Sequence, residues 1–354
     1  MRYLVTGGLG FIGSNFLQRN VLGRPGDTYV NADSCSYAAN PRSVANLEGA
    51  PNYRFERLDL ADGPAVRALI QEVQPEVVVH FAAESHVDRS IRGPESFLRS
   101  NIVGTHNLLE AVRELWGGRR DGVRFHHVST DEVFGSLGES GAFSEETPYD
   151  PSSPYAATKA ASDHLVRAWH RTFGLPVTVS NCSNNYGPRQ HPEKLIPLTI
   201  LNARAGLPLP VYGRGANVRD WLHVDDHCAA IERILEAGVP GRTYAVGGHG
   251  ERTNLEVVEA ICVAVAAETG REEASVRAQL RFVEDRPGHD FRYAIDPRRI
   301  ETELGWKPGW SFEDRLRDTV RWYLASEAWC QAAVNAEYHE WTKTHYGMRS
   351  EVSA

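Results

Sequence analysis

Residues 3–13 read Tyr3-Leu4-Val5-Thr6-Gly7-Gly8-Leu9-Gly10-Phe11-Ile12-Gly13, and this stretch decides the fold. The apolar run at its start predicts a short buried strand, and the glycines lead into an apolar segment with helical periodicity. Gly7, Gly10 and Gly13 have the spacing of a dinucleotide site. They allow a tight turn, close approach of the backbone to a pyrophosphate, and close packing of helix on strand.

A second strand, predicted over residues 28–32, ends on Asp33, twenty positions after Gly13. A carboxylate in that place can accept hydrogen bonds from an adenosine ribose. No Arg or Lys lies between Asp33 and Asn40 to bind a 2′-phosphate. The pattern therefore favours NAD over NADP.

Further strand signals alternate with helical patterns along the chain, at residues 53–56, 77–81, 123–128, 177–180 and 244–246. This alternation predicts an α/β fold with a doubly wound parallel sheet. After about residue 181, loops rich in Pro, Gly and Asn indicate a smaller C-terminal lobe. We expect residues 1–185 to form the first domain, with 222–250 returning to it, and residues 186–221 and 251–354 to form the second.

Composition excludes several classes of protein. The 354 residues are 42% hydrophobic and carry a formal net charge of −8, and no basic track for nucleic acid is present. No apolar run approaches the ~20 residues that span a bilayer, and the chain starts directly in its first strand without the layout of a signal peptide. The five cysteines are odd in number and lack a Cys-x-x-Cys pair, which indicates reduced thiols and a cytoplasmic protein.

Two segments, residues 129–135 and 153–159, bring together groups that can move protons. If Pro154 begins a helix, Tyr155 and Lys159 lie on one face, one turn apart. A nearby ammonium favours the phenolate, so we expect a lowered pKa that makes Tyr155 a base near neutral pH. Thr130 adds a hydroxyl, and the pair Asp131-Glu132 adds a carboxylic acid and a carboxylate.

Together these segments resemble the extended short-chain dehydrogenase/reductase superfamily, and within it the dTDP-glucose 4,6-dehydratases. Superfamily membership depends on the glycine loop with Tyr155 and Lys159, and the dehydratase assignment on Asp131 and Glu132, since epimerases of the superfamily generally lack that pair. The chain departs from the family after Asp33, where Ser34-Cys35-Ser36 replaces Lys-Leu-Thr. The similar stretches cover nearly the whole chain and include residues 81–91, 129–135, 181–188, 192–197, 218–222 and 284–290.

The resemblance implies a Rossmann domain that holds NAD and a smaller lobe that binds a nucleotide sugar, with dTDP-glucose as the expected substrate. It also implies a homodimer formed through helices over residues 97–115 and 155–173. The residues expected at the cofactor are Gly7, Gly10, Phe11, Ile12, Gly13, Asp33, Ser36, Asp59, Leu60, Phe81, Ala82, Ala83, Ser85, Ser100, Tyr155, Lys159 and Asn185. Those expected at the substrate are Ser85, Thr130, Asn184, Glu193, Lys194, Leu195, Pro210, Tyr212, Arg219, Asn254, Arg286 and His289.

The resemblance also implies a division of chemical roles. Tyr155, held near Lys159, takes the proton of the glucose C4 hydroxyl while hydride passes to NAD, and Thr130 hydrogen-bonds the C4 oxygen. Glu132 then removes the C5 proton, and Asp131, kept protonated by its acidic neighbour and by burial, protonates the departing C6 hydroxyl. The hydride returns to C6, so the net reaction is loss of water.

Other interpretations stay open at this point. A nucleotide-sugar epimerase or decarboxylase would keep Tyr155 and Lys159 without needing the acidic pair, and an NAD-sensing module would usually lose one of the two. The base of the nucleotide, thymine or uracil, is not specified by any motif. Residues 223–227, His-Val-Asp-Asp-His, resemble a metal site, but helix capping is the preferred interpretation and no metal is expected. We expect three tryptophans to fill the core of the smaller lobe, namely Trp306, Trp310 and Trp322.

Overall fold

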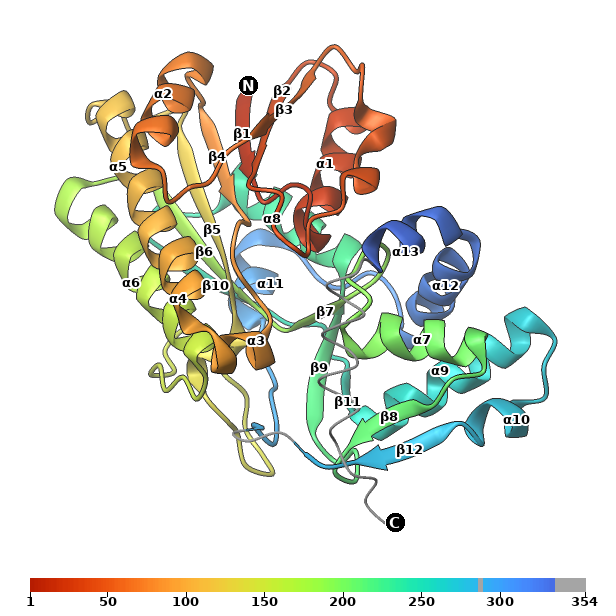
Figure 1. The fold of residues 1–354 in the computed structure, drawn as a ribbon. Coiled ribbons are helices and arrows are strands. Elements are labelled where there is room, and N and C mark those ends of the chain that lie inside the picture. The colour runs from red at the N-terminus through yellow and green to blue at the C-terminus, as the bar shows by residue number, and fades with distance from the viewer. Residues whose placement is uncertain (286–288, 335–354) are drawn as a thin grey trace.

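A parallel sheet of seven strands forms the centre of the larger lobe (Figure 1). Its order is β10-β6-β5-β4-β1-β2-β3, and every neighbouring pair is parallel. The structure is a computed structural model that describes residues 1–285 and 289–334. Each strand predicted from the sequence overlaps one strand of this sheet, which confirms the doubly wound fold. The strands are β1 (Arg2–Thr6), β2 (Thr28–Asp33), β3 (Tyr53–Arg57), β4 (Val77–His80), β5 (Arg124–Thr130), β6 (Val177–Cys182) and β10 (Thr243–Val246).

Helices cover both faces of the sheet, because parallel neighbours require long crossover connections. Side chains alternate between the faces: Leu4 packs in the cluster beneath α2, α5 and α6, whereas Tyr3 and Val5 pack beneath α1 and α8. Helix α11 lies on β10 and α8, although its residues fall in the range expected for the smaller lobe. The helices are α1 (Phe11–Gly23), α2 (Gly63–Val73), α3 (Val87–Arg92), α4 (Pro94–Phe97), α5 (Gly104–Trp116), α6 (Pro154–Phe173), α8 (Val224–Ala237) and α11 (Arg298–Leu304), with a π-helical turn over Leu98–Val103.

The smaller lobe consists of two short sheets backed by helices, seen at the lower right of Figure 1. One sheet has the order β11-β9-β7, and the other pairs β12 with β8 in parallel. Helices α7, α9 and α12 bury an apolar core that contains Ile200, Ile261 and Val320. Its elements are β7 (Asn184–Tyr186), β8 (Leu209–Tyr212), β9 (Val218–His223), β11 (Glu251–Thr253), β12 (Leu280–Val283), α7 (Leu195–Ala205), α9 (Asn254–Thr269), α10 (Glu273–Arg277), α12 (Phe312–Ala325) and α13 (Glu327–Ala333).

The expectation for the three tryptophans is correct only for Trp322, which packs against the core of the smaller lobe. Trp306 is buried among residues of α8, β10 and α11 and so belongs to the side of the large sheet. Trp310 is 64% exposed, with the guanidinium of Arg315 5.0 Å from the centre of its ring. The sequence does not distinguish these positions, because a tryptophan on a loop is placed by the lobes that the loop connects.

A search of the described residues for membrane-spanning helices finds none that is both long and apolar enough.

Candidate active site

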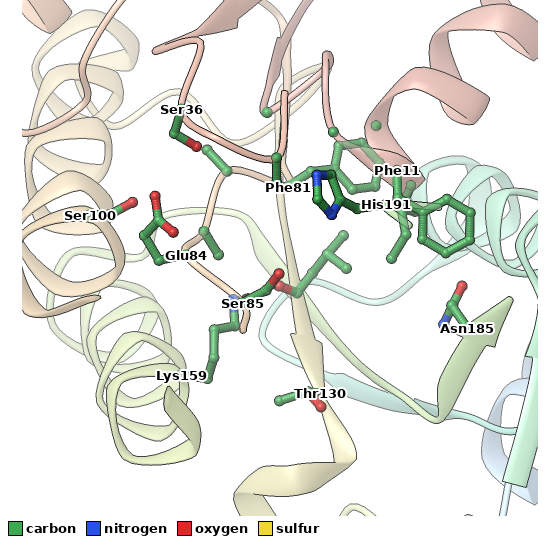
Figure 2. Close-up of a pocket in the computed structure, with 18 of the residues that line it drawn as sticks. Phe11, Ser36, Phe81, Glu84, Ser85, Ser100, Thr130, Lys159, Asn185 and His191 are labelled. Atoms are coloured by element: carbon green, nitrogen blue, oxygen red, sulfur yellow. Dashed lines mark hydrogen bonds between the residues drawn. The ribbon is translucent and has the colours of Figure 1, made fainter. Parts of the chain in front are cut away.

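A cavity of about 300 Å³ lies where β1, β2, β4, β5 and β6 reach their carboxyl ends (Figure 2). Parallel strands all end on the same edge of the sheet, so the loops that follow them meet there. The start of α7 closes the far side through Glu193 and Lys194. The cavity therefore lies between the large sheet and the smaller lobe.

The glycine loop between β1 and α1 forms one wall of the cavity and leaves no room for side chains. Gly7 has a φ of +74°, and a Cβ atom there would lie 2.6 Å from the backbone nitrogen of Ala82. A Cβ atom on Gly13 would lie 2.4 Å from the carbonyl oxygen of Gly7. Helix α1 begins with Gly10 as its N-cap and no capping side chain, so its first N–H groups are available to an anion.

Asp33, at the end of β2, anchors the two loops beside it. Its carboxylate accepts hydrogen bonds from the backbone N–H of Leu9 at 3.0 Å and of Cys35 at 2.8 Å. Burial raises the pKa of Asp33, while these two hydrogen bonds lower it. The carboxylate lines the cavity with further lone pairs that suit the hydroxyls of a ribose.

Strand β5 ends in a tight turn that carries three of the predicted catalytic residues. Thr130 is the N-cap of a short 3₁₀ helix over Asp131–Phe134, and its hydroxyl accepts a hydrogen bond of 3.2 Å from the backbone N–H of Glu132. Asp131 is buried, and burial together with the charge of Glu132 raises its pKa well above the ordinary value. The raised pKa favours the protonated form of Asp131, which is the direction that the sequence predicts.

Helix α6 begins at Pro154, as the sequence predicts, and places Tyr155 and Lys159 in the lining of the cavity. The prediction that Lys159 lowers the pKa of Tyr155 is wrong. Burial and the charge of Glu132 raise the pKa of Tyr155 well above its usual value. The Lys159 ammonium instead donates a hydrogen bond of 2.8 Å to the carbonyl of Val128.

Every residue expected at the cofactor lines this cavity, and Figure 2 shows Phe11, Ser36, Phe81, Ser100 and Asn185 around it. Of the residues expected at the substrate, five also line it, namely Ser85, Thr130, Asn184, Glu193 and Lys194. The others lie in the smaller lobe or at its edge and do not line the cavity: Leu195, Pro210, Tyr212, Arg219, Asn254 and His289. Arg286 lies outside the described residues.

Glu84 follows β4 in the same loop as Ser85, at a strand end where the sequence predicts candidate site residues, and it also lines the cavity. Two other cavity residues were not predicted from the sequence. Gln190 and His191 reach the cavity from the loop between β7 and α7, which carries no motif that points there. The ring of His191 packs edge-on against Tyr37, with the ring centres 5.7 Å apart.

The histidine-rich segment at the start of α8 has a structural role. The His223 side chain caps the helix by accepting from the backbone N–H of Asp225, and His227 Nδ1 lies 2.9 Å from Asn185 Oδ1. This second contact fixes the amide of Asn185 at the cavity wall. No cluster of metal ligands was found in the part of the chain that the structure describes.

Comparison with known proteins gives consistent matches. The model of the family described as GDP-mannose 4,6 dehydratase matches residues 4–319. A curated dTDP-glucose 4,6-dehydratase from Xanthomonas campestris pv. campestris is 55% identical over 341 residues, which cover 95% of this chain and 97% of the relative. The crystal structure of dTDP-glucose 4,6-dehydratase from Bacillus anthracis in complex with NAD has a TM-score of 0.84 at 42% identity, covering 94% of this chain and 99% of the other. UDP-glucose 4-epimerase from Thermus thermophilus, solved with NAD, has a TM-score of 0.81 at 30% identity, covering 92% and 100%.

Proposed function

The chain belongs to the GDP-mannose 4,6-dehydratase family, and from this membership we propose that it converts dTDP-glucose to the 4-keto-6-deoxy sugar with loss of water. The observation that carries the proposal is the turn Thr130-Asp131-Glu132, which lines the same cavity as Tyr155 and Lys159. Oxidation at a sugar hydroxyl needs only the last two, whereas elimination of water needs an acid and a base in addition. Both are present at one strand end.

The cavity suits NAD. The crowded glycines and the uncapped start of α1 provide a surface for pyrophosphate. The carboxylate of Asp33 provides an acceptor for a ribose. When bound, NAD supplies a hydride acceptor for C4 and a hydride donor for C6 of the same sugar. Ser36, Asp59 and Ser100 line the end of the cavity that we assign to the adenosine.

Tyr155 and Thr130 act at the C4 hydroxyl. We assign the phenol oxygen of Tyr155 as the base that takes the proton of this hydroxyl, and the Thr130 hydroxyl as a donor to the same oxygen. Lys159 favours the ionised phenol once the site is filled and water is excluded. Burial raises the pKa of Tyr155, so the phenol depends on the nearby Lys159 ammonium to act as a base near neutral pH.

Asp131 and Glu132 act in the elimination. Oxidation at C4 acidifies the hydrogen on C5, and Glu132 removes it as a general base. Asp131, protonated because of burial and the charge of Glu132, donates its proton to the departing C6 oxygen. Two carboxyl groups with opposite protonation states thus divide the acid and base roles.

The epimerase interpretation is weaker on the same evidence. The epimerase from Thermus thermophilus shares the fold, but inversion at C4 involves no loss of water and needs no buried acid beside a carboxylate. An NAD-sensing module would not need this pair either. Both alternatives predict that no 4-keto-6-deoxy product forms.

We further propose a cytoplasmic homodimer. The described cysteines are all free thiols, as a reducing compartment favours. Three exposed apolar side chains lie on the helical layer that the sequence assigns to the dimer contact, and these are Leu98, Val103 and Phe173. Docking this layer on a second copy would cover them.

The smaller lobe completes the proposed substrate site. We assign Leu195, Pro210, Tyr212, Arg219, Asn254 and His289, together with Arg286, to contacts with the nucleotide. Supporting geometry comes from the rings of Tyr212 and His289, whose centres lie 6.1 Å apart. A nucleotide that reaches them spans both lobes.

The proposal is tested by isotopic crossover. The purified protein converts a mixture of dTDP-glucose deuterated at C4 and dTDP-[¹³C]glucose without deuterium. The products are analysed by mass spectrometry and NMR. We expect deuterium at C6 of the same sugar that carried it at C4. Deuterium scrambled between the two sugars, or retained at C4, contradicts the proposal.

A further inference from the structure

The ammonium of Lys159 is buried, and so is the carboxylate of Asp163 one helical turn further along α6. Burial lowers the pKa of Lys159, and the negative charge of Asp163 raises it. Because a buried amine is driven toward its neutral form, the charge state of Lys159 depends on what faces it.

Burial favours the neutral form of three other titratable groups near this ammonium. They come from three strands: His80 on β4, His127 on β5 and Cys182 on β6. Burial lowers the pKa of both imidazoles and raises that of the thiol. Asp163 is the carboxylate that raises the pKa of Lys159.

The surroundings of Asp163 keep it ionised although its side chain has no exposed surface. Its Oδ2 accepts hydrogen bonds from the Tyr149 hydroxyl at 2.7 Å and from Asn181 Nδ2 at 3.1 Å. Its Oδ1 lies 3.2 Å from His127 Nε2. Burial alone would raise the pKa of Asp163, but His127, Lys159 and Tyr149 together lower it to about 2.

We propose that Asp163 is a positioning residue of the reaction: its fixed carboxylate keeps the buried Lys159 protonated, so that Lys159 can favour the ionised form of Tyr155. Asp163 does not line the cavity and acts only through Lys159. The kinetic part of this inference rests on the proposed function. The effect of Asp163 on the charge of Lys159 is a property of the protein alone and is measured without substrate.

The direct test follows the titration of Lys159 by NMR in protein labelled only at lysine. The chain has four lysines, at positions 159, 194, 307 and 343, so the spectrum is simple, and Lys159→Met identifies the signal. In Asp163→Asn we expect the Lys159 titration to move to lower pH by about one unit or more. An unchanged titration overturns the proposal, whatever reaction the protein catalyses.

Asp163→Asn removes the charge while preserving the shape. The amide oxygen can accept from Tyr149 and Asn181, and the amide nitrogen can donate to the other tautomer of His127. If this variant is not recovered folded, Asp163→Ser removes the same charge with a smaller side chain and is titrated instead. Tyr149→Phe is the control, because it removes one hydrogen bond from the same carboxylate and leaves the charge in place.

The kinetic readout is the pH dependence of kcat. With less positive charge on Lys159, Tyr155 is harder to ionise, so the acid limb moves to higher pH; Lys159 loses its proton earlier, so the basic limb moves to lower pH. We expect Asp163→Asn to narrow the pH profile of kcat from both sides, with little change in KM. Tyr149→Phe should leave both limbs at the pH values of the unmodified protein. Equal narrowing in both variants would show that packing, and not charge, is responsible.

Discussion

The hydroxyl of Thr130 donates a hydrogen bond of 3.3 Å to Oδ1 of Asp131. The same hydroxyl accepts from the backbone N–H of Glu132, so Thr130 holds the acid against the turn until its proton turns to the C4 oxygen that we assign to it. Asp131 is buried and carries a raised pKa, so the bond holds a proton donor in one direction at the end of β5. Neighbouring side chains in this turn therefore act in different steps of the proposed reaction, and substituting one of them tests its step alone.

Glu132→Gln and Asp131→Asn should stop the reaction at different bonds. In D₂O, the Gln variant should oxidise C4 without exchanging the C5 hydrogen, since it lacks the base. The Asn variant should still exchange C5 but lose water slowly, since it lacks the acid. We expect turnover in both to fall by about 10²- to 10⁴-fold.

The measurement is NMR of the recovered substrate for deuterium at C5, together with the yield of keto sugar. Glu139→Gln, which changes an exposed carboxylate in the following loop, is the control and should match the unmodified protein. If the Gln variant exchanges C5 at the normal rate, Glu132 is not the base.

Tyr155→Phe should lower kcat by orders of magnitude while leaving the affinity for dTDP-glucose nearly unchanged. The substitution removes the proton acceptor but keeps the ring that packs against Phe97, with centres 6.4 Å apart. Affinity is measured by calorimetry and turnover by product formation. Near-normal turnover would remove Tyr155 from the mechanism.

Gly13→Ala should weaken NAD binding by at least about tenfold, because the new methyl group meets the Gly7 carbonyl at 2.4 Å and displaces the phosphate loop. Gly23→Ala is the control on the same helix, since nothing lies within 4 Å of its Cβ position. That change should leave NAD binding intact and raise the free energy of unfolding by up to about 1 kcal/mol. NAD titration and thermal unfolding of both variants distinguish a local clash from general damage to α1.

Val103→Glu should convert the proposed homodimer to monomer. Val103 is 45% exposed in the π-helical turn before α5. In a contact about a two-fold axis, the introduced glutamate of each copy would be buried, so two charges would oppose association. Leu207→Glu is the matched control, since Leu207 is also exposed but lies just after α7 in the smaller lobe. Light scattering at micromolar concentration gives the mass. A monomeric mass for the unmodified protein is evidence against the dimer.

Local sequence patterns were sufficient for the fold and for most of the cavity. The spacing of Gly7, Gly10 and Gly13, the acid at the end of β2, and the pair Tyr155 and Lys159 at helical spacing each depend on a few adjacent residues. These residues are expected to meet at one site, because parallel strands end on one edge of the sheet. The raised pKa of Asp131 follows from sequence only in part: its acidic neighbour is adjacent in the chain, but burial, the larger cause, is set by the fold.

Tertiary structure decided what depends on burial and on neighbours distant in sequence. The pKa of Tyr155 is raised, contrary to the sequence prediction, because the phenol is buried near Glu132 while the Lys159 ammonium donates to the Val128 carbonyl. The anion that faces Lys159 has contacts from Tyr149, His127 and Asn181, three segments that the sequence does not connect. The sequence by itself indicated most of the groups that reach the cavity. Their charge states required the folded protein, because desolvation and Coulomb interactions depend on distances that only packing sets.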